Sequence, residues 1–158
     1  AGGKSNLFIE QAVTQNIEVG SDGTLTKTVT VNYKNPHPPS DCNLERGGLC
    51  LNAEFRDWIR VYVPKGSELI DSKGSSAKIE TYEELGKTVF DGLVRVRTQG
   101  SATFTITYKL PFKWEGSTLP VLIQKQPGTT NTPYKLIVNG RTRENFPLLT
   151  DIETKLKK

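Results

Sequence analysis

The segment from Phe55 to Pro64 alternates between apolar and polar residues, and this alternation limits what the chain can fold into. Ile59, Val61 and Val63 share one parity, whereas arginine and aromatic side chains occupy the other. A period of two is typical of a β-strand that has one face on a core. Pro64 lacks a backbone N–H and is expected to end the hydrogen-bonded ladder. The segment is therefore predicted to be a half-buried strand.

Two further segments, Thr24–Asn35 and Ser101–Leu110, alternate in the same way. Threonines fill the polar face of each, which is a common composition for a β-surface that faces solvent. Pro111 is expected to close the second segment. The apolar positions of these strands, with two from a neighbouring segment, are predicted to form the core: Val29, Val31, Ile59, Val61, Val63, Val94, Val96, Phe104, Ile106 and Tyr108.

Shorter apolar runs and turn signals divide the rest of the chain. Asp91-Gly92 and Asn139-Gly140 each suit a two-residue hairpin turn, and 71–76 is interpreted as a polar turn. Segments 78–85 and 150–158 are compatible with a strand or a helix, and we favour a strand for the second. The remaining predicted strands are 7–19 (one strand, or two at 7–13 and 16–19), 67–70, 86–90, 93–97, 119–126 and 134–138.

Many short strands separated by turns, with no persuasive amphipathic helix, predict an all-β fold. We expect an antiparallel, immunoglobulin-like β-sandwich of roughly eight to ten strands. A polar composition fits such a fold, because half of each strand faces water. Residues 1–23 are predicted to be an N-terminal arm or first strand, 24–140 the sandwich core, and 141–158 a C-terminal strand or tail of the same domain.

Cys42 and Cys50 are the two cysteines of the chain, and Gly47-Gly48 lies between them. The flexible glycines allow the chain to double back, which favours a local disulfide and an oxidising compartment. Two free thiols in a cytosolic loop remain the alternative. A metal site is not expected, because the single histidine cannot complete a tetrahedral set of soft ligands.

The 21 basic and 17 acidic residues are interspersed and leave a net charge of +4. An interspersed pattern indicates a mixed solvated surface, so no nucleic-acid partner is predicted. The sequence has no apolar run of the roughly 18 residues that a membrane-spanning helix needs, so this fragment is not expected to span a membrane.

A search for catalytic groups finds no persuasive candidate. His37 lies in an extended Asn-Pro-His-Pro-Pro segment and is interpreted as a surface residue. Glu80, Glu83 and Glu84 form the densest acidic group, but the surrounding sequence is typical of a solvated edge. Lys27 and Lys109 each lie in a strand suited to a self-formed Lys–Asn crosslink, yet both are expected on or near polar faces. No catalytic, cofactor-binding or metal-binding residue is therefore predicted.

Aromatic residues next to arginines are the remaining candidates for function, because such pairs suit sugar rings and protein partners. One group shares the outer parity of the 55–64 strand, and the other lies just past the end of the 101–110 strand. For each tryptophan the alternative is that a neighbouring segment covers it. The candidate partner-binding residues are Arg56, Trp58, Arg60, Tyr62, Phe112 and Trp114.

Four phrases of the sequence together resemble a known family: FRDWIRVYVPKGSEL, GKTVFDG, TFTITYKLP and LIQKQPGT. They are similar to the C-terminal extracellular region of large uncharacterised bacterial surface proteins (domain of unknown function, number four thousand and twelve). The resemblance runs from about Thr24 to Gly140 and does not include the Cys42–Cys50 loop. It implies an extracellular, cell-surface location and an N-terminal membrane anchor in the full-length protein, and it brings no catalytic motif.

These observations favour a non-catalytic surface module that binds or presents, with envelope polysaccharide or another surface protein as partner. An architectural spacer is the second hypothesis, and a carbohydrate hydrolase with a carboxylate pair is the third. A flat exposed aromatic patch would favour binding, whereas buried aromatics with termini at opposite ends would favour a spacer.

Overall fold

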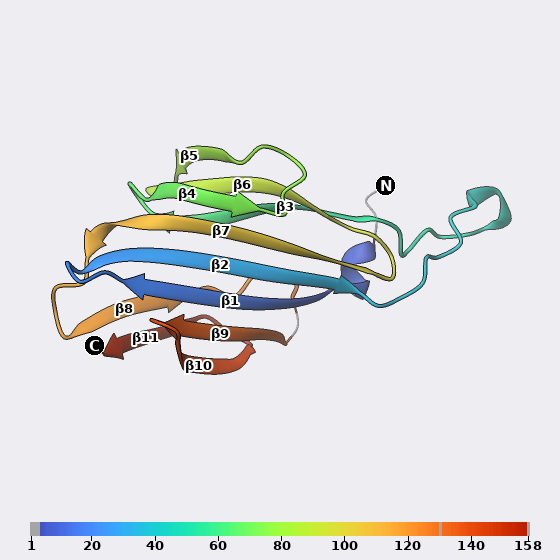
Figure 1. Ribbon diagram of the computed structural model, residues 1–158. Coiled ribbons are helices and arrows are strands. Elements are labelled where there is room, and N and C mark those ends of the chain that lie inside the picture. Colours follow the sequence, from blue (N-terminus) through green and yellow to red (C-terminus); the bar gives the residue numbers. More distant parts are fainter. Residues whose placement is uncertain (1–3, 130, 158) are drawn as a thin grey trace.

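The computed structural model describes residues 4–129 and 131–157 and shows a sandwich of β-sheets (Figure 1). One layer is a six-stranded sheet in the order β10-β9-β1-β2-β7-β4, and the other is split into a three-stranded sheet, β3-β6-β5, and a two-stranded sheet, β11-β8. The elements are η1 (Ser5–Phe8), β1 (Glu10–Val19), β2 (Thr24–Asn35), η2 (Leu44–Arg46), β3 (Phe55–Pro64), β4 (Glu68–Lys73), β5 (Glu80–Glu84), β6 (Lys87–Val96), β7 (Gly100–Lys113), β8 (Thr118–Ile123), β9 (Thr132–Val138), β10 (Arg141–Leu148) and β11 (Ile152–Lys157).

The expected all-β sandwich is confirmed, and β2 and β3 have the predicted bounds. Both predictions rested on the regular alternation of apolar and polar residues, which arises because each strand buries one of its faces. The described chain forms more strands than the eight to ten expected, and the strand β10 lies in the predicted tail. The pairing of β1 with β9 is parallel, so the large sheet is mixed rather than wholly antiparallel. The strand favoured for the C-terminal segment 150–158 is confirmed by β11. The segment 78–85, for which strand and helix were both open, contains the strand β5.

The predicted hairpin at Asp91-Gly92 is wrong, because β6 runs unbroken through both residues and pairs with β3 on one side and β5 on the other. A Cβ atom at Gly92 would lie 2.8 Å from Ile79 Cδ1 and 3.1 Å from Ser75 Oγ. The glycine therefore permits a close approach of the segment before β5, not a turn. The chain reverses instead at Leu85-Gly86, where φ is +51° and +69°.

Three smaller predictions are also corrected. The segment expected as a polar turn at 71–76 belongs in part to β4, which pairs with β7. Pro111 does not end β7; the strand continues to Lys113, and the proline lies where its register with β2 is irregular. The N-terminal segment forms η1 and then one continuous strand, β1.

The core lies between the two layers and contains most of the predicted residues. Val94, Val96, Phe104 and Ile106 are fully buried. Val29, Ile59 and Val61 face inward but are only half-buried. The core also has large aromatic members that were not in the predicted list, among them Phe90, which is fully buried, and Trp114, which is 3% exposed.

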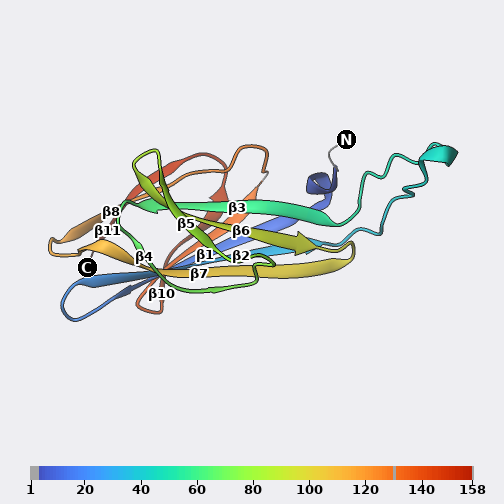
Figure 2. The same ribbon diagram turned by 90° about the horizontal axis from the view of Figure 1, so that it is seen from above.

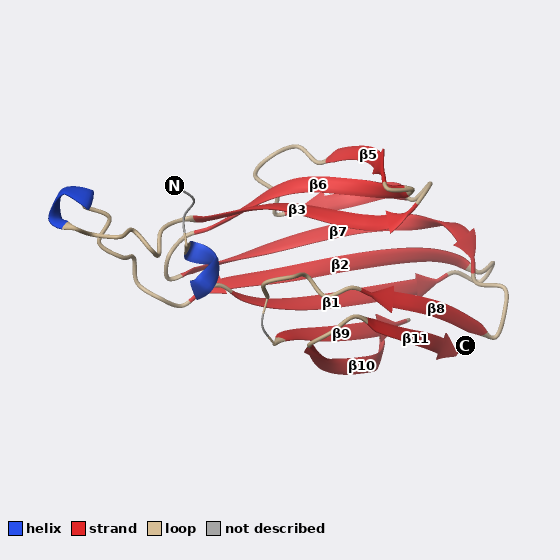
Figure 3. Cartoon of the chain, turned by 180° about the vertical axis from the view of Figure 1, so that it is seen from behind, coloured by secondary structure: helices blue, strands red, loops and turns tan. Residues whose placement is uncertain are grey.

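β3 and β8 are edge strands of the two smaller sheets, and in Figure 3 the strands β7, β2 and β1 are seen between them. Lys27 lies on the inner face of β2, opposite Tyr108 of β7 and Ile17 of β1. The expectation of a polar-face position for Lys27 is therefore wrong. Burial lowers the pKa of this lysine to about 8.

Candidate functional site

Four side chains project from the outer face of β3, and we call them the β3 face: Arg56, Trp58, Arg60 and Tyr62. Trp58 is 64% exposed and Tyr62 is 43% exposed, so no neighbouring segment covers Trp58, a question that the sequence left open. Successive members are two residues apart on one strand, which places them about 7 Å from each other. The indole of Trp58 thus stands between two guanidinium groups on an open surface.

Neighbouring strands hold these side chains in place. The Nε atom of Arg60 donates to Asp91 Oδ2 at 3.2 Å, and the hydroxyl of Tyr82 donates to the same oxygen at 3.2 Å. Tyr62 donates from its hydroxyl to a carboxylate oxygen of Glu84. This hydrogen bond raises the pKa of Tyr62 above its usual range, because the phenol must remain protonated to donate to the carboxylate. Strands β5 and β6 therefore fix the orientation of the Arg60 and Tyr62 side chains.

The arginine nearest the start of β3 is held in a similar way. Arg56 Nε donates to Glu54 Oε1 at 2.8 Å, and Arg95 Nη1 lies 3.8 Å from the same oxygen. The hydrogen bond from Arg56 is the main reason that the pKa of Glu54 is lowered. Both arginine side chains remain about half exposed, so their guanidinium groups can still meet a ligand.

Asp91 has a second, less usual property. Its other carboxylate oxygen, Oδ1, is buried and has no hydrogen-bond partner among the described residues. Val89 and Leu93 lie on either side of Asp91 on the outer face of β6 and are also buried. The outer face of this small sheet therefore has a shallow interior of its own, covered by the side chains of β3 and β5. The sequence did not reveal Tyr82, Asp91 or Arg95, because their proximity depends on pairing between distant strands.

The structure does not bring Phe112 and Trp114 to the β3 face. They lie at the end of β7, in and beyond the other sheet. Phe112 is 44% exposed, but Trp114 is buried, and its indole N–H has no partner in the described part of the chain. The expectation of an exposed Trp114 is therefore wrong. Its loop packs back onto the β1–β2 turn, where Trp114 N donates to Gly23 O at 2.8 Å.

A long loop between β2 and β3, residues 36–54, projects from one end of the sandwich, and we call it the arm (Figure 2). The predicted disulfide between Cys42 and Cys50 is present. Asn43 caps the short helix η2 by accepting hydrogen bonds from the backbone of Glu45 and Arg46. Three leucines near the tip are exposed: Leu44 and Leu49 at 75% each and Leu51 at 38%.

The root of the arm is tied to the sandwich by buried amides. Asn35 and Asn52 are at most 1% exposed, and Asn35 Nδ2 donates to Asn52 Oδ1 at 2.8 Å. Asn52 also donates to the backbone oxygens of His37 and Pro38. His37 is exposed, as predicted, and its ring lies 5.5 Å from that of Phe8. The outgoing and returning segments of the arm are therefore fixed to each other at the root.

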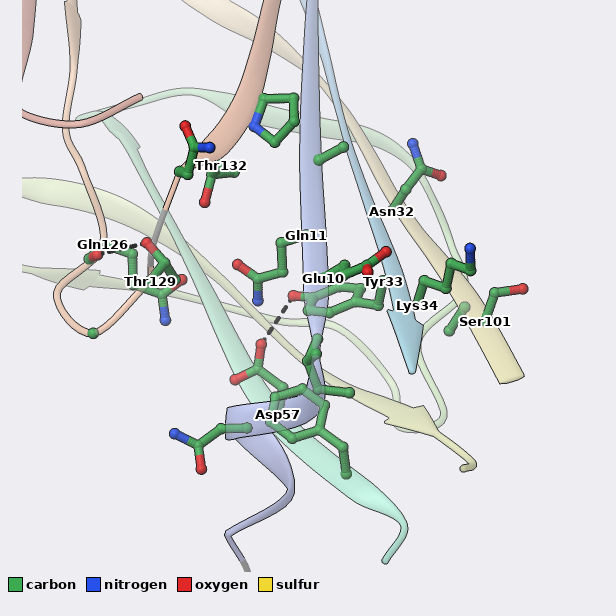
Figure 4. Close-up of a pocket in the computed structure, with 18 of the residues that line it drawn as sticks. Glu10, Gln11, Asn32, Tyr33, Lys34, Asp57, Ser101, Gln126, Thr129 and Thr132 are labelled. Atoms are coloured by element: carbon green, nitrogen blue, oxygen red, sulfur yellow. Dashed lines mark hydrogen bonds between the residues drawn. The ribbon is translucent and has the colours of Figure 1, made fainter. Parts of the chain in front are cut away.

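A cleft of about 890 Å³ opens beside the root of the arm, between the start of β3 and the loop that precedes β9 (Figure 4). Tyr33 donates from its hydroxyl to Asp57 Oδ2 at 2.9 Å inside it. Burial, and then the nearby Asp57 charge, raise the pKa of Tyr33 strongly, so the phenol remains the proton donor. Leu7, Ile9 and Phe55 supply apolar surface to the same cleft.

Comparisons with known proteins do not assign this chain to a family. No protein-family model matches the chain, and no curated protein matches it. Among solved structures, an M1 zinc metallopeptidase of Deinococcus radiodurans, bound to a Tyr-Ser-Ala substrate, is 11% identical, with a TM-score of 0.38. That alignment covers 83% of this chain but 32% of the peptidase, so the chain spans about a third of that protein's length.

An acetylcholine-binding protein of Biomphalaria glabrata is 15% identical, with a TM-score of 0.29; the alignment covers 83% of this chain and 63% of that one. At such low similarity neither protein bears on what this chain binds. Among the described residues, none of the helices has the length and apolar character needed to cross a lipid bilayer.

Proposed function

We propose that the chain is a non-catalytic module of the bacterial cell surface, whose β3 face binds an envelope polysaccharide. The observation that carries this proposal is the exposed indole of Trp58, held between Arg56 and Arg60 on a sheet surface. A sugar ring can stack on the indole while the flanking guanidinium groups donate to its hydroxyl or carboxylate oxygens. Tyr62, further along the strand, offers a second aromatic surface to the next part of an extended chain.

The absence of catalysis is part of the proposal and rests on how the acidic residues are engaged. Glu84 accepts the hydroxyl of Tyr62, and Glu83 forms an ion pair of 2.8 Å with Lys65. A glycosidase needs two carboxylates placed on either side of one bond. These glutamates are instead engaged with surface neighbours, which supports a binding role over a hydrolase.

The proposed extracellular location rests on two features. The Cys42–Cys50 bond is of a kind that persists in oxidising compartments. The phrases that resemble the bacterial surface-protein family imply the same location, together with a membrane anchor elsewhere in the full-length protein. The proposed partner is accordingly a polymer of the envelope, with another surface protein as the alternative.

The test is a binding screen of the purified domain against envelope polysaccharides and cell-wall fractions. We expect one fraction to bind and Trp58→Ala to weaken that binding by about 30-fold, as for an aromatic hot spot. Phe112→Ala is the matched control, because Phe112 is an exposed aromatic on the other sheet, and it should bind as the wild type does. Binding by no fraction, or equal binding by Trp58→Ala, would contradict the proposal.

A spacer role is the second candidate, and one observation favours it. The described chain begins at η1, beside the arm, and ends with β11 at the opposite end of the sandwich (Figure 1). A domain with this arrangement holds flanking segments apart. If the screen finds no ligand while the domain remains folded, the spacer becomes the better account.

A further inference from the structure

The end of the sandwich opposite the arm contains a pocket of about 670 Å³, which we call the end pocket. Segments of both layers meet there: the β1–β2 turn, the residues just past β7, the β9–β10 turn and the last residue of β11 (Figure 1). Val19 and Val138 supply apolar wall, and the other lining residues are mostly polar. Small-molecule sites have volumes of about 300–1,000 Å³ and combine apolar walls with a few polar groups. The end pocket therefore has the size and composition of a ligand site.

Trp114 lies in the wall of the end pocket and is 3% exposed. Its indole nitrogen Nε1 is buried and has no acceptor among the described residues. An indole N–H can only donate, so only an acceptor can satisfy it. Because nearly all buried polar groups of native proteins have a partner, a donor left without one needs an explanation. The indole N–H indicates that the pocket is completed by an acceptor from outside the chain.

Asn139 adds a second donor whose orientation is fixed. Its Oδ1 atom accepts a hydrogen bond from the backbone N–H of Val19 at 2.8 Å. A backbone N–H can bond only to the oxygen of a side-chain amide, so this contact distinguishes the amide oxygen from the amide nitrogen. The NH₂ group of Asn139 is thus the part that remains to donate at the wall of the pocket.

Two cationic side chains also line the end pocket, Arg143 and Lys157. Arg143 is the extra residue of a β-bulge, because the pairing of β10 with β9 passes from Thr142 directly to Glu144. A bulge redirects the side chain of its extra residue away from the regular alternation of the strand. Neither cation takes part in an ion pair within the described ranges 4–129 and 131–157. Both positive charges are therefore available to a ligand.

The carboxylates of the end pocket do not cancel these charges. Asp22 accepts hydrogen bonds from Lys113 Nζ at 2.9 Å and from the backbone N–H of Thr24 at 3.1 Å. The hydrogen bond from Lys113, followed by those from Thr24, holds the pKa of Asp22 well below its usual range. Glu115 is the other carboxylate of the wall. Three cations, with Lys113 included, thus face two carboxylates, which leaves a net positive charge.

We propose that the end pocket binds an anionic group, the carboxylate or phosphate of a small ligand or of one unit of a polymer. The guanidinium group of Arg143 can donate two parallel hydrogen bonds to such a group, and Lys157 adds a second positive charge. The N–H groups of Trp114 and Asn139 donate to the remaining oxygens of the ligand. The end pocket and the β3 face share no residue, so this proposal does not depend on polysaccharide binding at the β3 face.

The test follows the indole N–H signals of the ¹⁵N-labelled domain by NMR while glucuronate, inorganic phosphate or glucose is added at constant ionic strength. The chain has two tryptophans, so the variant Trp58→Phe identifies the signal of Trp114. We expect that signal to move downfield and to saturate with at least one of the two anions, with a dissociation constant of about 1 mM. Neutral glucose should leave it in place. The signal of Trp58 reports on the β3 face separately, so failure of one site is distinguishable from failure of the other.

The double variant Arg143→Gln/Lys157→Gln tests the two cations. The dissociation constant of the anion should rise at least about 10-fold, because charge-assisted hydrogen bonds are lost. Arg141→Gln/Lys155→Gln is the matched control, since it removes the same charge from the same two strands at residues outside the pocket wall. It should bind the anion as the wild type does. All four side chains are exposed, so both variants should keep the melting temperature of the wild type.

Each outcome supports or overturns the proposal. Saturation by glucuronate alone identifies a carboxylate ligand and saturation by phosphate alone a phosphate-bearing one, and either result supports an anion site. A Trp114 signal that neither anion moves would mean that trapped water is the acceptor, which overturns the proposal. An equal shift with glucose also overturns it. So does an equal loss of affinity in the two double variants, because the overall charge of the molecule would then attract the anion.

Discussion

The inner face of the six-stranded sheet has two kinds of region, buried flanks and a half-open centre. On the flanking strands β7 and β9 most inward residues are apolar or aromatic and at most 5% exposed, among them Phe104, Ile106 and Leu136. On the central strands β1 and β2, Ile17 and Leu25 are fully buried near one end, but Val13 and Val29, in the middle of the strands, are only half-buried. In most sandwiches the centre of a sheet is its driest part. Here the middle of the two central strands is less covered than the flanking strands, because the second layer is divided into two smaller sheets.

The polar residues of the inner face follow the same division. Lys27, Gln11 and Gln15 all lie on the central strands and face inward. Gln15 accepts a hydrogen bond from the Tyr134 hydroxyl at 2.6 Å, while its side-chain amide nitrogen has no partner among the described residues. The comparison teaches that coverage by the second layer, and not the position of a strand within its sheet, decides what a strand can bury.

The largest expected effect contrasts one residue from each region. Phe104→Ala removes a fully buried ring from a covered flank and should lower the free energy of unfolding by about 3–5 kcal/mol. Val29→Ala removes a half-buried side chain from the open centre and should cost about 1 kcal/mol. Urea denaturation monitored by tryptophan fluorescence measures both. Equal losses of unfolding free energy in the two variants would mean that the second layer covers the centre to the same extent as the flanks.

Lys27 provides the next test, through pH. Its pKa is about 8 in the folded state and 10.5 when free, so between these values the folded protein binds fewer protons than the unfolded chain. The free energy of unfolding should therefore rise with pH from 8, by about 2–3 kcal/mol up to pH 10. Above pH 10 the buried tyrosines, whose pKa values are raised, reverse the trend.

The control for this titration is Lys27→Met, which keeps the bulk of the side chain and removes the charge. The variant should be more stable than the wild type at pH 7, and the rise between pH 8 and 10 should disappear. Denaturation midpoints across this range measure it. If the free energy of unfolding of Lys27→Met still rises between pH 8 and 10, a group other than Lys27 causes the rise. Lys27 would then not be a buried charge in the centre of the sheet.

The arm is a third region, outside both flank and centre, and its disulfide tests whether it folds with them. The loop closed by Cys42 and Cys50 is short, and the chain-entropy model gives about 2–3 kcal/mol for such a bond. Because Asn35 and Asn52 join the arm to the core, Cys42→Ser/Cys50→Ser should lose about 2 kcal/mol. An unchanged melting temperature would mean that the arm opens independently. Intact mass on reduction, with a gain of two protons, verifies the starting state.

The smallest expected effect on stability concerns Trp58, which lies on the outer face of β3, away from the core. Trp58 is exposed, so Trp58→Ala should change the melting temperature by less than about 2 °C, within the range of surface substitutions. Thermal denaturation by circular dichroism measures this. Unfolding of the variant would make Trp58 a structural residue and would remove the main support for the β3 face as a binding site.

Periodicity predicted the parts of the fold that depend on one strand at a time. The bounds of β2 and β3, and the outward direction of Trp58, followed from alternation within a single segment. Trp114 lies just past a strand, where alternation no longer indicates a direction, and its burial could not be inferred. The disulfide was predictable because its two cysteines are local.

The incorrect predictions depended on contacts between distant segments. Asp91-Gly92 has the composition of a turn, but β3 and β5 pair with it from both sides and keep it extended. Lys27 was expected on or near a polar face, although the alternation of its own strand puts it on the side of Leu25 and Val29, where the structure places it. Neither the split between the smaller sheets nor the cleft can be inferred from a single sequence, since both depend on how strands pair across the chain.

The parallel pairing of β1 with β9 has a consequence for how the molecule acquires its structure over time. Val19 N donates to Asn139 Oδ1, and these residues are 120 positions apart. A ribosome adding about 5–20 residues per second needs on the order of 6–24 s to supply the second after the first. During this interval β1 and β2 can form a hairpin, but the other edge of β1 has no partner. An unpaired edge is prone to join other chains. The nascent protein therefore passes through a vulnerable intermediate that ends only when β9 arrives.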